Sequence, residues 1–253
     1  MTMLKEYDFP LSEFDENKSA VLSPAHEKIP VTIPKNLVFA FLGDFVSEYA
    51  EKSGFSACAT FETITKKIKI YSSPDGSVGL CEAPLGAPAS AQLLDWLIAY
   101  GAENIIAVGS CGVLADIPEN ALLVPEKALR DEGTSYHYKK PSRFVSTDDF
   151  MRGKLKSYLA ENNFPFEECI TRTTDGIFRE TEKKVAARRA GGCKCVEMEC
   201  AALCACAEFR NARFAQLLFT ADSLADTENY DERNWGVASF TKALSICLSA
   251  ISK

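Results

Sequence analysis

The sequence predicts an α/β fold, a single domain built as a three-layer α/β sandwich around a mixed, largely parallel central sheet. Short, nearly continuous apolar runs, typical of strands buried on both faces, alternate with segments of helical spacing. Strands that alternate with helices favour a sheet covered on two sides. The 253 residues and the apolar share of 47% suffice for one core, and no repeat, low-complexity tract or linker divides 1–253.

The first half of the chain begins with an irregular stretch and continues with regular elements. Residues 1–35 contain four prolines, mixed charge and no clear period, so we expect an irregular arm that covers the body. Pro74-Asp-Gly76 is typical of a hairpin turn, and Gly101 ends the second helix. The elements are a strand at 36–42, a helix at 45–52, strands at 66–71 and 77–81, a helix at 91–100 and a strand at 104–108.

The second half alternates in the same way. The glycines of Gly109-Ser-Cys-Gly112 predict a loop that turns its main-chain N–H groups toward a ligand. The segment 131–138 is expected to be a loop or an irregular strand. The other elements are a strand at 121–124, a helix at 148–162, a strand at 169–174, helices at 180–190 and 201–209, a strand at 214–220 and a closing helix at 235–251.

Charge and hydropathy exclude several classes of partner. The net charge of −7 and the absence of a long Lys/Arg cluster argue against nucleic acid and against an anionic membrane. The stretch Met1–Asp8 carries acids and lacks the apolar core of a signal peptide. No apolar run approaches the ~20 residues that a membrane span needs. We therefore expect a cytoplasmic protein.

The ten cysteines fit a reducing cytoplasm, because several lie inside apolar strings, where cysteine behaves as a small buried hydrophobe. Five of them cluster between Cys193 and Cys206, a density that also raises the question of a metal site. The cluster contains no CxxC pair, and no histidine or second ligand pair lies nearby. We expect no metal.

The stretch from Cys195 to Asp226 carries the predicted chemistry. Two carboxylates, Glu197 and Glu199, flank Met198, and the strand at 214–220 runs into Asp222. Because ligands of open α/β sheets bind beyond the carboxyl ends of strands, Asp222 lies where a functional acid belongs. Structural alternatives stay open: Asp222 as the cap of a turn, Glu199 as an acid complementing a helix dipole, and Glu197 pointing away from any pocket.

Four motifs, in this order, carry a resemblance: Gly43-Asp44, Val108-Gly-Ser-Cys-Gly112, Val196-Glu-Met-Glu199 and Ala221-Asp222. From about Leu37 to its end, the chain resembles the nucleoside phosphorylase family of the uridine and hexameric purine nucleoside phosphorylase type. Members cleave the glycosidic bond of a nucleoside with inorganic phosphate, yielding ribose 1-phosphate and free base. The resemblance implies a nucleoside phosphorylase-like fold, no metal or organic cofactor, and a homodimer or a hexamer of dimers.

The resemblance also assigns roles to residues near the sugar and the base. Glu199 would bind the ribose hydroxyls, with Met198 against the sugar and Glu197 framing the pocket. Negative charge near the sugar suits the oxocarbenium-like state of glycosidic cleavage. Asp222 would assist the departing base as an acid of raised pKa. Phe178 would stack on the base.

The phosphate side departs from the family pattern. Gly43, Gly109 and Ser110 match positions that contact phosphate, and Arg179 is assigned to phosphate or base. Ala107 and Ser47 stand where relatives carry phosphate-binding arginines. A nucleosidase that uses water, and a nucleoside-binding protein without turnover, are therefore kept as alternatives to phosphorolysis. The choice between purine and pyrimidine is open.

Overall fold

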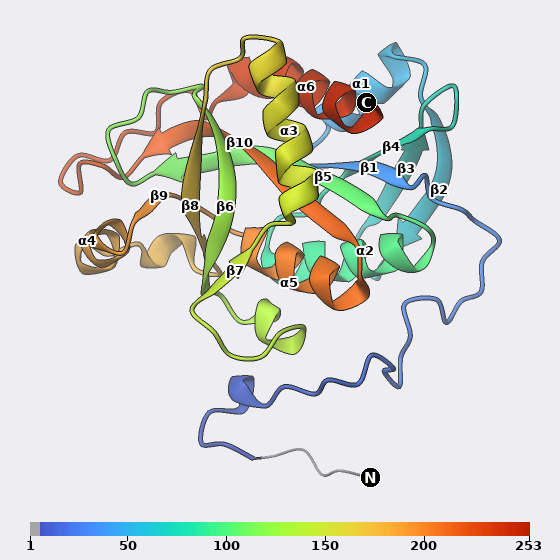
Figure 1. Cartoon of the computed structure of the whole chain (residues 1–253), viewed down its shortest axis with the longest axis horizontal. Coiled ribbons are helices and arrows are strands. Elements are labelled where there is room, and N and C mark those ends of the chain that lie inside the picture. Colours follow the sequence, from blue (N-terminus) through green and yellow to red (C-terminus); the bar gives the residue numbers. More distant parts are fainter. Residues whose placement is uncertain (1–5) are drawn as a thin grey trace.

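The computed structural model describes residues 6–253, and one sheet of ten strands runs through them (Figure 1). The strand order is β10-β6-β8-β9-β5-β1-β4-β3-β2, and β7 pairs with β6. The strands are β1 (Asn36–Ala40), β2 (Ser56–Glu62), β3 (Lys67–Ser72), β4 (Val78–Glu82), β5 (Asn104–Val113), β6 (Leu122–Asp131), β7 (Phe144–Ser146), β8 (Phe166–Thr174), β9 (Cys193–Glu197) and β10 (Arg213–Ser223). The α-helices are α1 (Phe45–Lys52), α2 (Ala87–Ala99), α3 (Asp149–Glu161), α4 (Glu182–Ala190), α5 (Cys200–Arg210) and α6 (Phe240–Ser252).

Helices cover the two faces of the sheet, as the sandwich prediction requires. Helices α2 and α5 lie on one face, and α1, α3 and α6 lie on the other (Figure 1). Successive side chains of a strand point to opposite faces. Phe39 of β1 accordingly packs in the core beneath α2 and α5, while its neighbour Val38 packs in the core beneath α3 and α6. The structure confirms the predicted α/β fold.

The sheet is mixed, with parallel pairing through its middle. Strand β1 pairs parallel with β4 and β5, and β5 pairs parallel with β10. Strands β2 and β3 form an antiparallel edge hairpin. Because β10 pairs with both β5 and β6, the strands β5, β10, β6, β8 and β9 close into a ring. The stretch predicted to carry the chemistry therefore starts in β9 and ends just after β10, and both strands belong to this ring.

Several predicted boundaries are wrong. Gly109-Ser-Cys-Gly112 is not a loop, because the pairing of β5 with β10 continues through Gly109 and Ser110 and keeps this segment extended. The closing helix begins at Phe240 and not at Trp235, because Trp235 and Gly236 have φ angles of 53° and 67°, which a right-handed helix cannot contain. Strands β2, β7 and β9 were not predicted.

The arm has the expected irregular form over its described part. Residues 6–35 contain a single 3-10 turn, at Pro10–Ser12, and run along the outside of the body near α5 (Figure 1). Phe14 packs edge-on against Phe209 of α5, with 6.2 Å between ring centroids, and Ile33 is buried in the core. Residues 1–5 lie outside the described part. Within residues 6–253, no helix is long and apolar enough to cross a membrane.

Candidate active site

One cavity of about 740 Å³ gathers most of the predicted site residues. Glu199, at the start of α5, and Asp222, near the end of β10, both line it, although they come from separate elements. The sheet therefore brings the two carboxylates to one hollow. The other predicted site residues that line this cavity are Gly109, Ser110, Phe178, Glu197 and Met198.

Glu197 is occupied by the protein itself. Its Oε2 accepts hydrogen bonds from the main-chain N–H groups of Glu199 at 2.7 Å and Cys200 at 2.6 Å. Its Oε1 accepts one from the Thr173 hydroxyl at 2.6 Å. These donors include main-chain N–H groups at the start of α5, which would otherwise have no partner. Glu197 thus holds the first turn of α5 in place rather than offering free oxygens to a ligand.

Glu199 is held by the loop before α2. Its Oε1 accepts a 2.7 Å hydrogen bond from the main-chain N–H of Gly86, whose φ of 94° favours glycine. Burial raises the pKa of Glu199 to about 7. Burial and the neighbouring Glu199 also raise the pKa of Glu197, so the two carboxyls titrate as a pair. Near neutral pH Glu199 is therefore present in both its ionised and its protonated form.

Asp222 is packed against the glycine of a neighbouring strand. A Cβ placed on Gly112 would lie 3.1 Å from Asp222 Oδ1, so only glycine gives the carboxyl this space. The Tyr230 hydroxyl donates to Asp222 Oδ2 at 3.1 Å. Burial raises the pKa of Asp222 above the usual value for an aspartate. Arg233 does not form an ion pair with it and donates instead to main-chain oxygens, including that of Ile117 at 2.9 Å.

Exposed apolar side chains surround the mouth of the cavity. Phe178, which lies in a 3-10 turn at Ile177–Arg179, lines the cavity but is 95% exposed. Leu85 and Trp235, on other segments, line it too and are 77% and 50% exposed. Large apolar side chains exposed around one opening are typical of a binding surface.

Two predicted residues are not brought to the cavity. Gly43 lies in the turn between β1 and α1, with a φ of 55°, and is exposed. Arg179 is exposed, and neither residue lines the cavity. Any contact of these two with phosphate stays a prediction.

Among the cavity residues that the sequence reasoning missed, Gln216 and Glu180 each have a buried oxygen without a partner in the described chain. Gln216, in the middle of β10, is 1% exposed, and its Oε1 has no hydrogen-bond partner in the described chain. Glu180 also lines the cavity and has one buried oxygen without a partner. A polar letter inside the apolar run 214–220 was the available signal for Gln216. Glu180 was assigned to a helix, but α4 begins at Glu182.

The cavity is lined by acidic side chains. Four carboxylates face it, and no Lys or Arg is among its lining residues in the described chain. Residues 6–253 hold no group of three or more His, Cys, Asp or Glu that could bind a metal ion. The four acids are Glu180, Glu197, Glu199 and Asp222.

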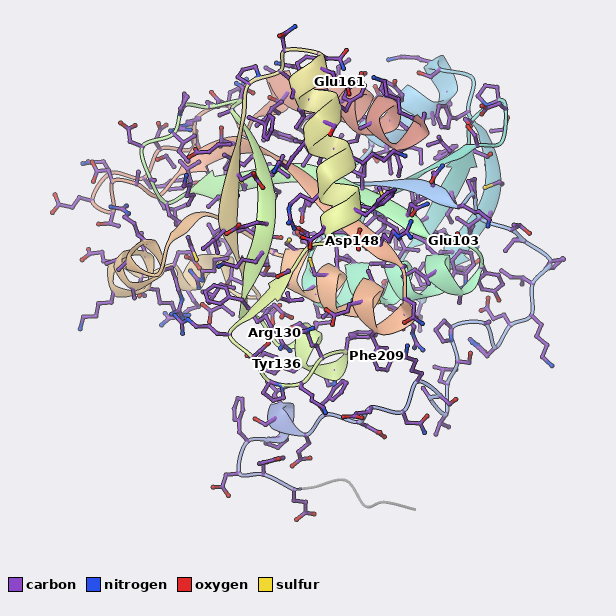
Figure 2. All side chains as sticks on the ribbon, viewed as in Figure 1. Glu103, Arg130, Tyr136, Asp148, Glu161 and Phe209 are labelled. Atoms are coloured by element: carbon purple, nitrogen blue, oxygen red, sulfur yellow. The ribbon has the colours of Figure 1, made fainter. Side chains whose placement is uncertain are left out.

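The segment Arg130–Tyr138 builds a buried support outside the cavity. Arg130 is 5% exposed, and its guanidinium lies 4.2 Å from the centroid of the Tyr136 ring (Figure 2). It donates to the hydroxyls of Ser135 at 2.8 Å and Ser142 at 2.9 Å, and to the main-chain oxygen of Lys139 at 3.0 Å. Arg130 therefore fixes the loop after β6.

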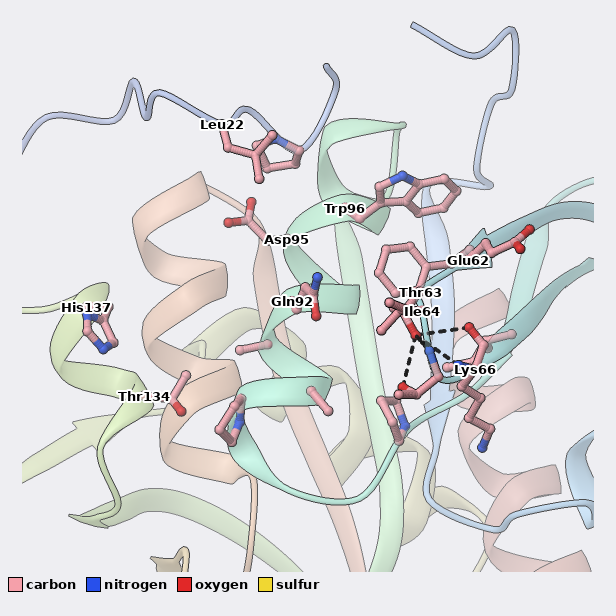
Figure 3. A pocket seen from close by; sticks show the side chains of 18 of the residues that line it. Leu22, Glu62, Thr63, Ile64, Lys66, Gln92, Asp95, Trp96, Thr134 and His137 are labelled. Carbon is pink, nitrogen blue, oxygen red and sulfur yellow. Dashed lines mark hydrogen bonds between the residues drawn. The ribbon is translucent and has the colours of Figure 1, made fainter. Parts of the chain in front are cut away.

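A larger hollow, of about 1010 Å³, lies between the arm, α2 and the β2–β3 hairpin (Figure 3). Trp96, Thr63 and Gln92 line it, and His137 lines it on the side opposite Trp96 (Figure 3). None of the predicted site residues lines this hollow. The larger volume of this hollow therefore does not make it the candidate site. The smaller cavity is the candidate, because it holds the acidic side chains and most of the predicted site residues.

The chain belongs to the Phosphorylase superfamily, whose sequence profile matches residues 38–253. The resemblance read from the motifs is thereby confirmed. A guanosine phosphorylase from Halorubrum lacusprofundi is 25% identical over 146 residues, which is 57% of this chain and 61% of that protein. The match thus spans less than two thirds of that relative's length.

Solved structures with the same fold include both reaction types. A uridine phosphorylase from Vibrio fischeri superposes with a TM-score of 0.71 at 19% identity, covering 91% of this chain and 93% of that one. An AMP nucleosidase from Bacteroides thetaiotaomicron superposes with a TM-score of 0.71 at 18% identity, covering 87% and 88%. At these identities the likeness shows the fold alone.

Proposed function

We propose that this chain is an enzyme that cleaves the N-glycosidic bond of a nucleoside. The observation that carries the proposal is the meeting of Glu199 and Asp222 in one cavity. Glu199 binds the hydroxyls of the sugar, and Asp222 assists the departure of the base. Membership of the superfamily supports the same reaction class.

Glu199 binds the ribose. An ionised carboxylate accepts hydrogen bonds from two neighbouring hydroxyls, and such charge-assisted bonds are the strong ones. The Gly86 hydrogen bond fixes the orientation of this carboxylate. As the sugar becomes oxocarbenium-like, the nearby negative charge stabilises it. Met198 lies against the sugar, and Glu197 acts only by positioning α5.

Asp222 assists the leaving base. Its raised pKa keeps a proton available for the base nitrogen at a pH where an ordinary aspartate has lost it. The Tyr230 hydroxyl and Gly112 hold the carboxyl in position. Phe178 stacks on the base from the mouth of the cavity.

Inorganic phosphate is the proposed nucleophile, with ribose 1-phosphate as product. The superfamily description and the guanosine phosphorylase relative support it. Gly109 and Ser110 contribute to the anion site. Residues 6–253 place no Lys or Arg at the cavity, so a neighbouring copy supplies the cations that a phosphate needs.

A homodimer, or a hexamer of dimers, is therefore part of the proposal. The exposure of Phe178, Leu85 and Trp235 around the mouth supports a second copy at this face. The ten free cysteines support a reducing compartment such as the cytoplasm.

Hydrolysis is the second candidate, favoured by the four acidic side chains of the lining and by the absence of Lys and Arg from it among residues 6–253. A dianionic phosphate is repelled there, whereas water is not. Base release from a nucleoside panel, with and without inorganic phosphate, separates the two candidates. We expect release that requires phosphate and yields ribose 1-phosphate. Equal rates without phosphate, with ribose as product, would assign the chain to the nucleosidases.

A further inference from the structure

A smaller hollow, of about 450 Å³, lies between the arm, the loop after β6 and helix α4. Its lining combines three arginines with one carboxylate, in a chain whose net charge is −7. The arginines are Arg130, Arg143 and Arg188, and the carboxylate is Asp131. None of these four residues lines the cavity of Glu199 and Asp222. This arginine pocket is therefore distinct from the candidate active site.

Two of the positive charges at the arginine pocket have no carboxylate partner. Asp131 binds Arg188, with 3.0 Å between Oδ2 and Nη2, and also binds the buried Arg172, whose second partner is Glu180. These two arginines and two carboxylates balance one another. The other two arginines of the site, Arg130 and Arg143, form no ion pair within residues 6–253.

The end of the β6–β7 pairing brings Arg130 and Arg143 together. The main-chain N–H of Arg130 donates to the carbonyl oxygen of Arg143 at 3.0 Å. The buried guanidinium of Arg130 donates only to neutral oxygens, which are those of two serine hydroxyls and two main-chain carbonyls. Burial lowers the pKa of Arg130, as expected for a charge held away from water. An anion in the arginine pocket would supply the missing counter-charge.

The free donors of the arginine pocket suit a phosphate group. The guanidinium of Arg143 and the hydroxyl of Ser12 form no hydrogen bond in the part of the chain that the structure describes, and Arg188 adds a second guanidinium. Guanidinium groups match the oxygens of a phosphate, and two of them with a hydroxyl can bind several of its oxygens at once. Phe9, which is 63% exposed, and Tyr136 add an aromatic wall beside these donors.

We propose that the arginine pocket binds a phosphate monoester, in which a phosphate group is joined to a flat or apolar organic group. The phosphate lies against Arg143, Arg188 and Ser12, and the organic group lies against Phe9 and Tyr136. This binding does not depend on the reaction proposed for the acid-lined cavity.

Calorimetric titration with phenyl phosphate tests the site by comparing wild type with Arg143→Ala. The loss of a guanidinium should weaken binding by on the order of 10-fold or more. Arg143→Lys keeps the charge but loses the planar fork, so its affinity should fall between the two. The matched control is Arg213→Ala, which removes an exposed arginine that stacks on Phe150 outside the pocket. This control should bind phenyl phosphate as wild type does.

Titration with inorganic phosphate separates a phosphate ester from free phosphate as the ligand. Phenyl phosphate should bind more tightly, because only the ester reaches Phe9 and Tyr136. Inorganic phosphate that binds as tightly as the ester would overturn the assignment of an ester. Phosphate bound at the acid-lined cavity contributes equally to wild type and Arg143→Ala, so it cancels in their comparison. Equal affinity of these two proteins for phenyl phosphate would overturn the site itself.

Base release by Arg143→Ala checks that the arginine pocket is a separate site. Because Arg143 does not line the acid-lined cavity, the variant should release base at the rate of wild type. A loss of base release together with the loss of ester binding would place Arg143 at the active site of a neighbouring copy, and would overturn the proposal of a separate site.

Discussion

The main-chain N–H of Gly86 donates a 2.7 Å hydrogen bond to Oε1 of Glu199, although 113 positions separate the two residues. This bond ties the loop before α2 to the first turn of α5. Glu197 holds the same turn from the other side through the N–H groups of Glu199 and Cys200. The proposed sugar-binding carboxylate is therefore fixed before any ligand arrives, which lowers the entropic cost of binding.

Glu199→Ala should lower kcat/KM by on the order of 10²-fold or more, because its charge-assisted bonds to the sugar strengthen in the transition state. Steady-state kinetics with the preferred nucleoside measures the effect. Glu208→Ala is the control, since Glu208 lies on the same helix and binds the surface residue Lys139. A variant at position 199 with wild-type kcat/KM would reject the sugar-binding role.

The pH profile of kcat/KM should be bell-shaped. The sugar-binding form of Glu199 is the ionised one, and its pKa of about 7 makes activity fall as the pH drops below neutrality. Asp222 acts in its protonated form, and its raised pKa moves the alkaline fall to higher pH than for an ordinary aspartate. Glu199→Gln should lose the acidic limb. Activity that is flat between pH 5 and pH 7, a range set by the usual carboxyl and histidine values, would contradict this assignment.

Gly112→Ala should damage activity more than stability. The new Cβ would lie 2.9 Å from Leu224 Cδ1 and 3.1 Å from Asp222 Oδ1, so the acid must move. We expect kcat/KM to fall on the order of 10-fold to 10²-fold. Gly153→Ala is the matched control, because nothing lies within 4 Å of its Cβ position in α3, and it should stabilise by about 0.5–1 kcal/mol. Full activity in Gly112→Ala would show that the position of Asp222 does not matter.

Gln216→Leu should raise stability and lower activity. The substitution removes a buried amide whose Oε1 has no partner in the described chain. Removing this unpaired oxygen should raise the free energy of unfolding by about 1–3 kcal/mol. It also removes a polar contact from the cavity, so kcat/KM should fall. Urea denaturation and kinetics on the same preparation measure both effects. A destabilised variant with wild-type kinetics would mean that Gln216 is structural.

The sequence predicts the fold well wherever periodicity and turn residues agree. The buried strand before Asp222 and the small-residue helix α5 are both observed, since each has one dominant pattern. The loop predicted at Gly109–Gly112 failed because glycine signals local freedom, whereas neighbours on both sides of β5 hold this segment extended. Tertiary pairing overrides local propensity there.

The sequence predicts those residues of the candidate site that belong to recognisable motifs. Glu199 and Asp222 were identified from spacing and resemblance, and the structure places both in one cavity. The different status of Glu197 depends on three hydrogen bonds that no periodicity reports. The free oxygens of Gln216 and Glu180 are likewise visible only once the surrounding partners are known.

A crystal structure with a bound nucleoside, or an unreactive analogue, would show whether Glu199 binds the sugar and Asp222 faces the base. We expect the two ribose hydroxyls within hydrogen-bond distance of the Glu199 carboxylate, with the base between Phe178 and Asp222. A nucleoside bound in the hollow beside Trp96 and His137, or one whose sugar lies away from Glu199, would show that the cavity at Glu199 and Asp222 is not the active site (Figure 3).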